Sequence, residues 1–151
     1  MEQVEGFSFI GIQTRTTNEN NLSGLVMSEL WRKFHADDVF LSIPNKSDDR
    51  IFVIYTDYEK DHTKSYTALI GAKVSGIHHI PRNMVGRQFP EANFERFVAA
   101  GKLPESVIRT WQKIWEENET LKRKYLYDFE VYSPIVQAGV SPEVDIFVSV
   151  A

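Results

Sequence analysis

A short stretch in the C-terminal part of the chain carries the residues best suited to chemistry. The segment from Tyr127 to Tyr132 places two carboxylates and phenols among apolar residues. Its aromatic and β-branched residues favour a strand, in which successive side chains point to opposite faces. Asp128, Glu130 and Tyr132 then share one face. The opposite, apolar face, which we expect to meet helices, carries Tyr127, Phe129 and Val131.

An acid beside aromatic rings is suited to binding a cation. If the Glu130 face lines a cavity, the lone carboxylate costs several kcal/mol, on the order of 3–5, when it is ionised. Burial then raises the pKa of Glu130, unless a positively charged partner stabilises the ionised carboxylate. Flat lipophilic cations fit such a site, because each ring face adds roughly 0.5–2 kcal/mol by cation–π attraction. The plainer alternative is a solvated outer face of an antiparallel strand.

Composition indicates an ordinary single domain. The chain has 151 residues, of which 42% are hydrophobic, 25% charged and 13% aromatic, which suffices for one core. The net charge of −4 argues against nucleic acid, whose binding proteins usually present a basic surface. The one dense basic run, Lys122-Arg123-Lys124, is expected to be solvated.

Several classes of site are excluded or disfavoured. The chain has no cysteine, so it forms no disulfide or thiolate metal site, and no common catalytic or nucleotide-binding motif is present. We expect neither a cofactor nor a metal. We expect His78 and His79 to lie on the surface. We also expect His35 and His62 to be solvated. Neither a signal peptide nor a membrane-spanning run is evident, so a soluble cytoplasmic protein without membrane contact is expected.

Hydrophobic periodicity predicts the elements that position the acid. Pro104 suits the first position of a helix, and a short strand is expected at 77–80. The other expected strands cover residues 7–16, 50–58, 64–74, 93–100, 127–132 and 144–150, and the helices cover residues 23–36 and 104–115.

The order of the predicted elements indicates an internal duplication. Each half has the order strand, helix, strand, strand, and the helices align Trp31 with Trp111 and Lys33 with Lys113. We therefore predict one α+β domain over residues 1–151, with a first repeat at about 5–75 and a second at about 76–151. The predicted architecture is a tandem βαββ repeat with pseudo-twofold symmetry. Two helices pack on one side of a mostly antiparallel sheet, and a ligand groove lies between the repeats on the other side.

Three features of the second half resemble the GyrI-like, or AraC-type effector-binding, domain of bacterial multidrug-responsive transcription activators. They are Ile80-Pro81 ahead of the strand 94–101, the helix with Trp111 and Ile114, and the acid-bearing strand 128–132. In the first half, 54–58 and 66–74 are also similar to this family, especially to its stand-alone members. These members include integron cassette proteins that bind cationic drugs.

The resemblance implies a function and a set of site residues. It implies a bacterial stand-alone protein that binds lipophilic, drug-like cations, with Glu130 as the groove carboxylate and no direct DNA binding, since no helix-turn-helix module is left over. Family members also suggest two alternatives: a hydrolase with Glu130 as general acid or base, and a module that binds a protein such as gyrase or a transcription regulator. The candidate ligand-binding residues are Glu130, Tyr132, Tyr55, Tyr66, Trp31, Trp111, Phe97 and Phe147.

Overall fold

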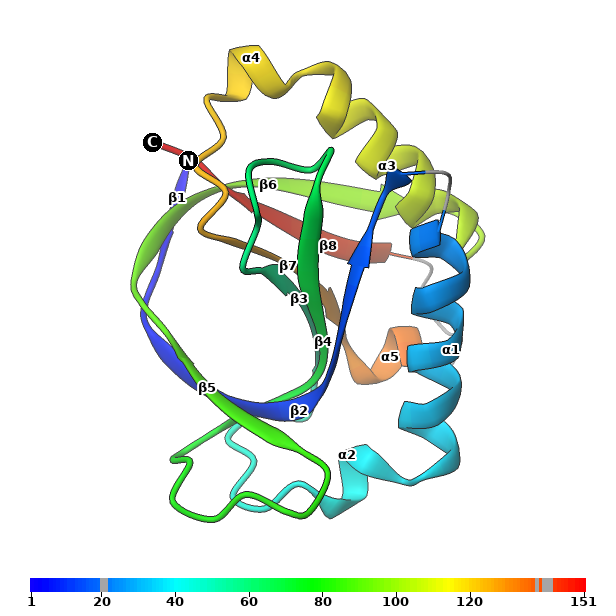
Figure 1. Cartoon of the computed structure of the whole chain (residues 1–151), viewed down its shortest axis with the longest axis vertical. Coiled ribbons are helices and arrows are strands. Elements are labelled where there is room, and N and C mark those ends of the chain that lie inside the picture. The colour runs from blue at the N-terminus through cyan, green and yellow to red at the C-terminus, as the bar shows by residue number, and fades with distance from the viewer. Residues whose placement is uncertain (20–21, 138, 140–142) are drawn as a thin grey trace.

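One curled antiparallel sheet organises the molecule. The computed structural model describes residues 1–19, 22–137, 139 and 143–151. In this part of the chain an eight-stranded sheet bends into a half-barrel, with the long helices on its outside (Figure 1). The strands are β1 (Glu2–Val4), β2 (Phe7–Thr17), β3 (Ile51–Thr56), β4 (Ser65–Val74), β5 (Val85–Phe89), β6 (Ala92–Ala100), β7 (Tyr127–Tyr132) and β8 (Glu143–Ser149). The helices are α1 (Leu22–Ala36), α2 (Val39–Ser42), α3 (Glu105–Glu116), α4 (Asn118–Leu121) and α5 (Pro134–Gln137).

Strand order reveals the duplication. The sheet runs β1-β6-β8-β7-β3-β4-β2-β5, so β6-β8-β7 on one side of the centre mirrors β2-β4-β3 on the other. This arrangement confirms the predicted tandem βαββ fold. Each half also lends an edge strand to the other half. Strand β1 of the first half pairs with β6 of the second, and β5 of the second half pairs with β2 of the first. Because each half completes the sheet of the other, the halves are joined by more than the central β3–β7 pairing.

Both faces of the sheet are buried at the central strands β3, β4 and β7, and the two faces differ in character. The outer face packs against α1 in the first half and against α3 in the second. The inner face of the curl is filled by a cluster that contains no helix residue and is rich in aromatic rings. Its buried members are Phe9, Phe52, Ile54, Leu69, Phe89, Phe94, Tyr127, Phe129 and Val131.

The expected orientation of β7 is therefore wrong. The apolar side chains of Tyr127, Phe129 and Val131 fill the inside of the curl, and it is the Glu130 face that meets the helices. The alternation of side chains along a strand assigns residues to two faces correctly. When both faces are buried, it does not indicate which face packs against a helix.

A facing pair of glycines accompanies the bend. Gly11 on β2 lies directly opposite Gly71 on β4. A Cβ on Gly11 would overlap the carbonyl oxygen of Ile70, and a Cβ on Gly71 would overlap that of Ile10. Both positions share the inward face with Phe9 and Leu69. Glycine thus permits a backbone approach that any side chain would block.

Two strands differ from the prediction. Residues 77–80 form no strand, with a bend at 78–79, and the strand in this region is β5, slightly later in the chain. The N-terminal strand β1 was also not predicted. Both are short edge strands whose partners are distant in sequence, so their pairing leaves little local pattern.

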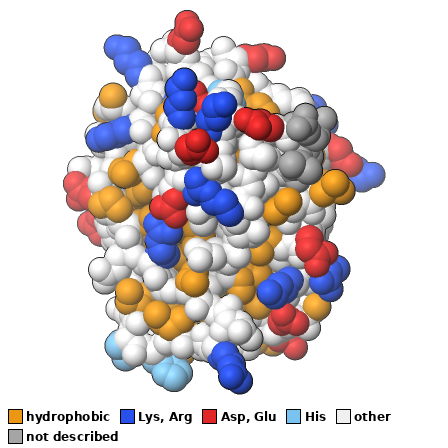
Figure 2. All heavy atoms as spheres, in the orientation of Figure 1, with side chains coloured by type: hydrophobic (Ala, Val, Ile, Leu, Met, Phe, Trp, Pro, Cys, Tyr) orange, Lys and Arg blue, Asp and Glu red, His pale blue; other side chains and the backbone are white. Residues whose placement is uncertain are grey.

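The surface of the described residues is mixed in charge. Lysine and arginine side chains alternate with aspartate and glutamate on the face shown in Figure 2. No helix in the described ranges has the length and apolar character needed to cross a membrane.

Candidate ligand-binding site

A cavity of about 430 Å³ lies where α1 and α3 meet the sheet. Its volume is within the range of sites that take drug-sized ligands. It contains residues of both halves, as the predicted groove between the repeats requires. It opens on the helix-covered side of the sheet, however, whereas the expected groove lay on the opposite side. The inward face is instead closed by the aromatic cluster. The lining residues are Asn18, Ser23, Gly24, Met27, Ser28, Trp31, Tyr55, Tyr58, His62, Tyr66, Pro104, Val107, Ile108, Trp111, Gln112, Trp115, Arg123, Glu130 and Tyr132.

Glu130 is the buried acid of this cavity. The residue is only 2% exposed, and three neutral groups donate hydrogen bonds to the carboxylate. The Tyr55 hydroxyl and the Trp111 Nε1 donate to Oε2 at 2.8 and 2.7 Å, and the Tyr132 hydroxyl donates to Oε1 at 2.8 Å. No basic side chain within the described residues forms an ion pair with Glu130.

Burial is the main influence on the pKa values of Glu130 and of the phenols that contact it. Loss of hydration raises the pKa of Glu130 above its ordinary value of 4.5, while the hydrogen bonds from Trp111, Tyr132 and Tyr55 act in the opposite direction. Burial, and next the charge of Glu130, raise the pKa of Tyr55 and Tyr132 well above the usual 10. The phenols therefore remain protonated donors at neutral pH.

Aromatic rings form the walls around the carboxylate. Tyr55 meets Trp111 edge to face with ring centroids 5.6 Å apart, and it meets Tyr66 at 5.8 Å. On the α1 side, Trp31 meets Tyr132 at 5.1 Å. These edge-to-face contacts are a favoured geometry for aromatic pairs, and they hold the rings that surround Glu130.

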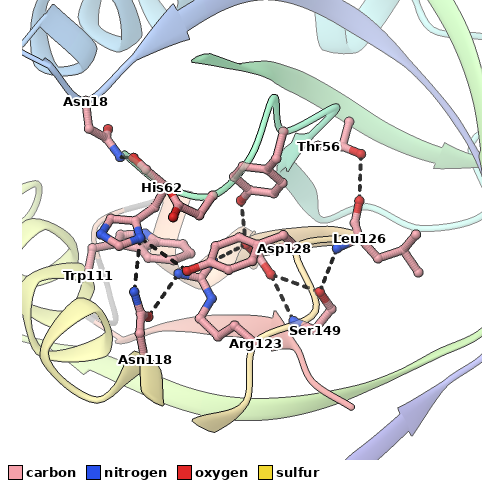
Figure 3. Close-up of polar contacts among 12 residues, drawn as sticks. Asn18, Thr56, His62, Trp111, Asn118, Arg123, Leu126, Asp128 and Ser149 are labelled. Atoms are coloured by element: carbon pink, nitrogen blue, oxygen red, sulfur yellow. Dashed lines mark hydrogen bonds and ion pairs between the residues drawn. The ribbon is translucent and has the colours of Figure 1, made fainter. Parts of the chain in front are cut away.

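A second polar network adjoins the cavity (Figure 3). Arg123 and Asp128 form an ion pair, and their side chains are 1% and 0% exposed. Asp128 also accepts hydrogen bonds from the Tyr58 hydroxyl and from the backbone N–H of Ser149. The expected solvated role of Arg123 is wrong, because its guanidinium neutralises the buried Asp128.

His62 also differs from its expected solvated state. Its ring stacks on Trp115 with centroids 5.3 Å apart and planes 13° apart. Its Nδ1 lies 3.0 Å from Asn118 Nδ2 and 3.2 Å from the Tyr125 hydroxyl. Burial, and next the charge of Arg123, lower the pKa of His62 below its ordinary value of 6.5.

Six of the eight predicted site residues line this cavity, and two do not. Phe147 lies on the inward face of β8, where it stacks on Phe129 at 4.7 Å. Phe97 packs beside the α3 cluster without lining the cavity. Phe147 was misplaced because adjacency of β8 to β7 does not decide which face a side chain takes. Phe97 lies on the helix-covered face, but its strand β6 is separated from β7 by β8. The six lining residues are Glu130, Tyr132, Tyr55, Tyr66, Trp31 and Trp111.

The prediction missed other lining residues, including His62, Trp115 and Arg123. Trp115 is the last residue of the helix expected at 104–115 and follows Trp111 by four positions, so its helical spacing was a usable signal. His62 and Arg123 lie in connections between elements, where no periodicity indicates burial. Within the described ranges, no three His, Asp or Glu side chains are grouped closely enough to hold a metal ion.

An aromatic cavity enclosed by two helices and a curled sheet defines this protein as a small-molecule-binding domain of the effector-binding class. The chain belongs to the Cass2 family of integron-associated effector-binding proteins, whose family model matches residues 1–150. The resemblance inferred from the sequence is thus confirmed. The family and fold establish ligand binding in general terms.

Individual relatives extend the comparison. The protein YobU of Bacillus subtilis (strain 168), named for transcriptional regulation, is 24% identical over 148 residues, which are 94% of this chain and 91% of YobU. The integron cassette protein VCH_CASS2 from the mobile metagenome of Vibrio cholerae has a TM-score of 0.78 and 25% identity, with 99% of this chain and 94% of that chain covered. SAV2435, solved with tetraphenylphosphonium bound, has a TM-score of 0.74 and 13% identity, with 99% and 92% covered.

Proposed function

We propose that this protein reversibly binds lipophilic cations in the cavity between α1 and α3, with Glu130 as the anchor. One observation carries the proposal: the buried carboxylate of Glu130 accepts three hydrogen bonds from neutral groups and has no ion-pair partner among the described residues. The other buried acid of this strand, Asp128, already has Arg123. Strand β7 thus carries one acid that Arg123 neutralises, beside the cavity, and one in the cavity that a cationic ligand can neutralise.

The energetics favour a cation with a large apolar surface. Neutral donors reduce the penalty of ionising Glu130 but do not remove it, since the net shift of its pKa is upward. A cation that enters the cavity supplies the missing charge, and its apolar surface covers the rings of Tyr55, Trp31 and Trp111. Each cation–π contact adds roughly 0.5–2 kcal/mol.

The arrangement also suits more than one ligand. A delocalised cation is attracted to Glu130 without a strict hydrogen-bond direction, and aromatic walls accept many shapes. Such a site discriminates by charge and size more than by exact structure. SAV2435 shares the fold and was solved with tetraphenylphosphonium, so this cation is the natural first probe for the present chain.

Tryptophan fluorescence offers a direct test. The chain has three tryptophans, and Trp31, Trp111 and Trp115 all line the cavity. Titration with tetraphenylphosphonium should give saturable quenching, and Glu130→Gln should weaken binding at least tenfold, about 1.4 kcal/mol. The matched control is Glu29→Gln on the exposed side of α1, which should bind as the wild type does.

The same titration separates the alternatives. Equal affinity of wild type and Glu130→Gln would contradict the anchor, and absence of binding would contradict the proposed function. A lipophilic cation that carries an ester group should be recovered unchanged after long incubation if the protein only binds it. Hydrolysis of that ester that depends on Glu130 would favour the hydrolase hypothesis instead.

A further inference from the structure

His62 is held in a fixed position at the cavity. It belongs to the connection between β3 and β4, and its backbone carbonyl accepts a hydrogen bond from Asn18 Nδ2 at 2.9 Å. Asn18 is itself fixed, because its Oδ1 accepts a hydrogen bond from the Tyr66 hydroxyl at 2.7 Å. The imidazole stacks on Trp115. The ring is therefore oriented by contacts on its backbone and on its flat face.

The neighbours of His62 determine which ring nitrogen carries the proton. Arg123 Nη1 donates to Asn118 Oδ1 at 3.2 Å. Since arginine has no acceptor, this contact fixes the amide of Asn118 with its oxygen toward Arg123 and its NH₂ group toward His62. That NH₂ group lies 3.0 Å from His62 Nδ1. Nδ1 must then be an acceptor, and the proton of the neutral ring lies on Nε2.

The Nε2–H group of His62 has no hydrogen-bond partner among the residues that the structure describes. Nε2 is also not among the buried, unpartnered polar atoms of those residues, so it is accessible to solvent. His62 lines the same cavity as Glu130. Figure 3 shows the Nδ1 edge of the ring turned toward Asn118 and Arg123, so the opposite edge is left for a ligand. The lowered pKa of His62 keeps the ring neutral at pH 7.

We propose that His62 is a specificity-determining residue, whose Nε2–H donates a hydrogen bond to an acceptor atom on the bound ligand. The inference rests on the proposed function and narrows the ligand class: a lipophilic cation that also carries a carbonyl, ether or similar acceptor on its apolar part. Glu130 binds the positive charge, and His62 recognises the acceptor.

Two phosphonium probes of matched shape test this proposal. (4-Acetylphenyl)triphenylphosphonium has a carbonyl acceptor that (4-isopropenylphenyl)triphenylphosphonium lacks. The wild type should bind the acetyl probe about three- to tenfold more tightly, the factor that one neutral hydrogen bond supplies. His62→Phe keeps a ring for Trp115 to stack on and should abolish the preference. His35→Phe is the matched control, because His35 also stacks on a tryptophan, Trp31, without lining the cavity.

The tautomer can be measured without any variant. Two-dimensional ¹H–¹⁵N NMR of the histidine rings at about pH 7.5 should show His62 neutral and protonated on Nε2. The Nε2 signal should shift with the acetyl probe more than with the isopropenyl probe. A ring protonated on Nδ1 would overturn the proposal, and so would equal affinity of the wild type for both probes.

Failure of this inference is distinguishable from failure of the proposed function. If neither probe binds, or if Glu130→Gln binds both as well as the wild type does, cation binding at this site is contradicted. If both probes bind equally and both are weakened by Glu130→Gln, the cation site stands and the role of His62 is overturned.

Discussion

The indole of Trp111 on α3 donates a hydrogen bond to the carboxylate of Glu130 on β7 across 2.7 Å. This contact connects a helix to the sheet at the cavity. It uses the only donor of a side chain that otherwise packs as an apolar wall, against Tyr55 at 5.6 Å. One residue thus both shapes the cavity and lowers the cost of a buried charge.

Trp111→Phe should test this double role. The substitution keeps an aromatic wall but removes the donor, so we expect the free energy of unfolding to fall by about 1–3 kcal/mol and the pKa of Glu130 to rise further. Urea unfolding measures the first effect. Trp115→Phe is the control, because Trp115 stacks on His62 and forms no hydrogen bond with Glu130. An equal loss in both variants would mean that packing alone explains the effect.

Glu130 should make the stability of the ligand-free protein depend on pH. Its pKa in the folded chain is above the ordinary 4.5, so the folded state retains this proton when the unfolded state has lost it. The contribution of Glu130 to the free energy of unfolding therefore declines as the pH rises above about 4.5. The decline ends once the pH exceeds the pKa of Glu130 in the folded state. Glu130→Gln lacks this decline.

Urea unfolding of both proteins at about pH 5 and pH 8 measures this difference. The stability of Glu130→Gln relative to the wild type should increase with pH over this interval. If the stability of Glu130→Gln relative to the wild type stays constant or decreases between these two pH values, a raised pKa of Glu130 is contradicted.

The buried ion pair should be sensitive to loss of one partner. Arg123→Met leaves Asp128 charged and 0% exposed, which should lower the free energy of unfolding by about 3–5 kcal/mol. Arg96→Met removes an arginine from the more exposed pair with Asp145 and should cost less than about 1 kcal/mol. Equal losses measured by urea unfolding would show that Asp128 does not depend on Arg123.

Gly24 should control the size of ligand that the cavity admits. It lines the cavity near the start of α1, and a Cβ built there meets nothing within 4 Å. Gly24→Ala should stabilise the helix by about 0.5–1 kcal/mol and leave tetraphenylphosphonium binding nearly unchanged. Gly24→Trp should fill that space and weaken binding. Unchanged affinity in Gly24→Trp, measured by fluorescence titration, would place the ligand elsewhere.

Much of this fold could be predicted from local patterns. The alternation around Glu130 separated the two faces of β7 correctly, and the stripes containing Trp31 and Trp111 located both long helices. Which face the helices cover could not be predicted, since β7 is buried on both sides. Phe147 was misplaced for the same reason.

The burial of Arg123 had no signal in the sequence. Its neighbours Lys122 and Lys124 are exposed, so the basic run resembles a solvated loop. The chain turns at Lys122 and Tyr125, which both have φ of 55°, and this turn carries Arg123 inward to Asp128. His62 likewise reaches the cavity through tertiary contacts with Asn18, Asn118 and Trp115, none of which is near it in sequence.

Charge selectivity is the most direct test of the carboxylate-anchored cavity. Tetraphenylphosphonium and tetraphenylborate have nearly the same size and shape and opposite charge, and isothermal titration calorimetry can compare them under identical conditions. The wild type should bind the cation at least tenfold more tightly, about 1.4 kcal/mol, and Glu130→Gln should lose most of this preference. Equal binding of the two ions by the wild type, or an undiminished preference in Glu130→Gln, would contradict the role of Glu130.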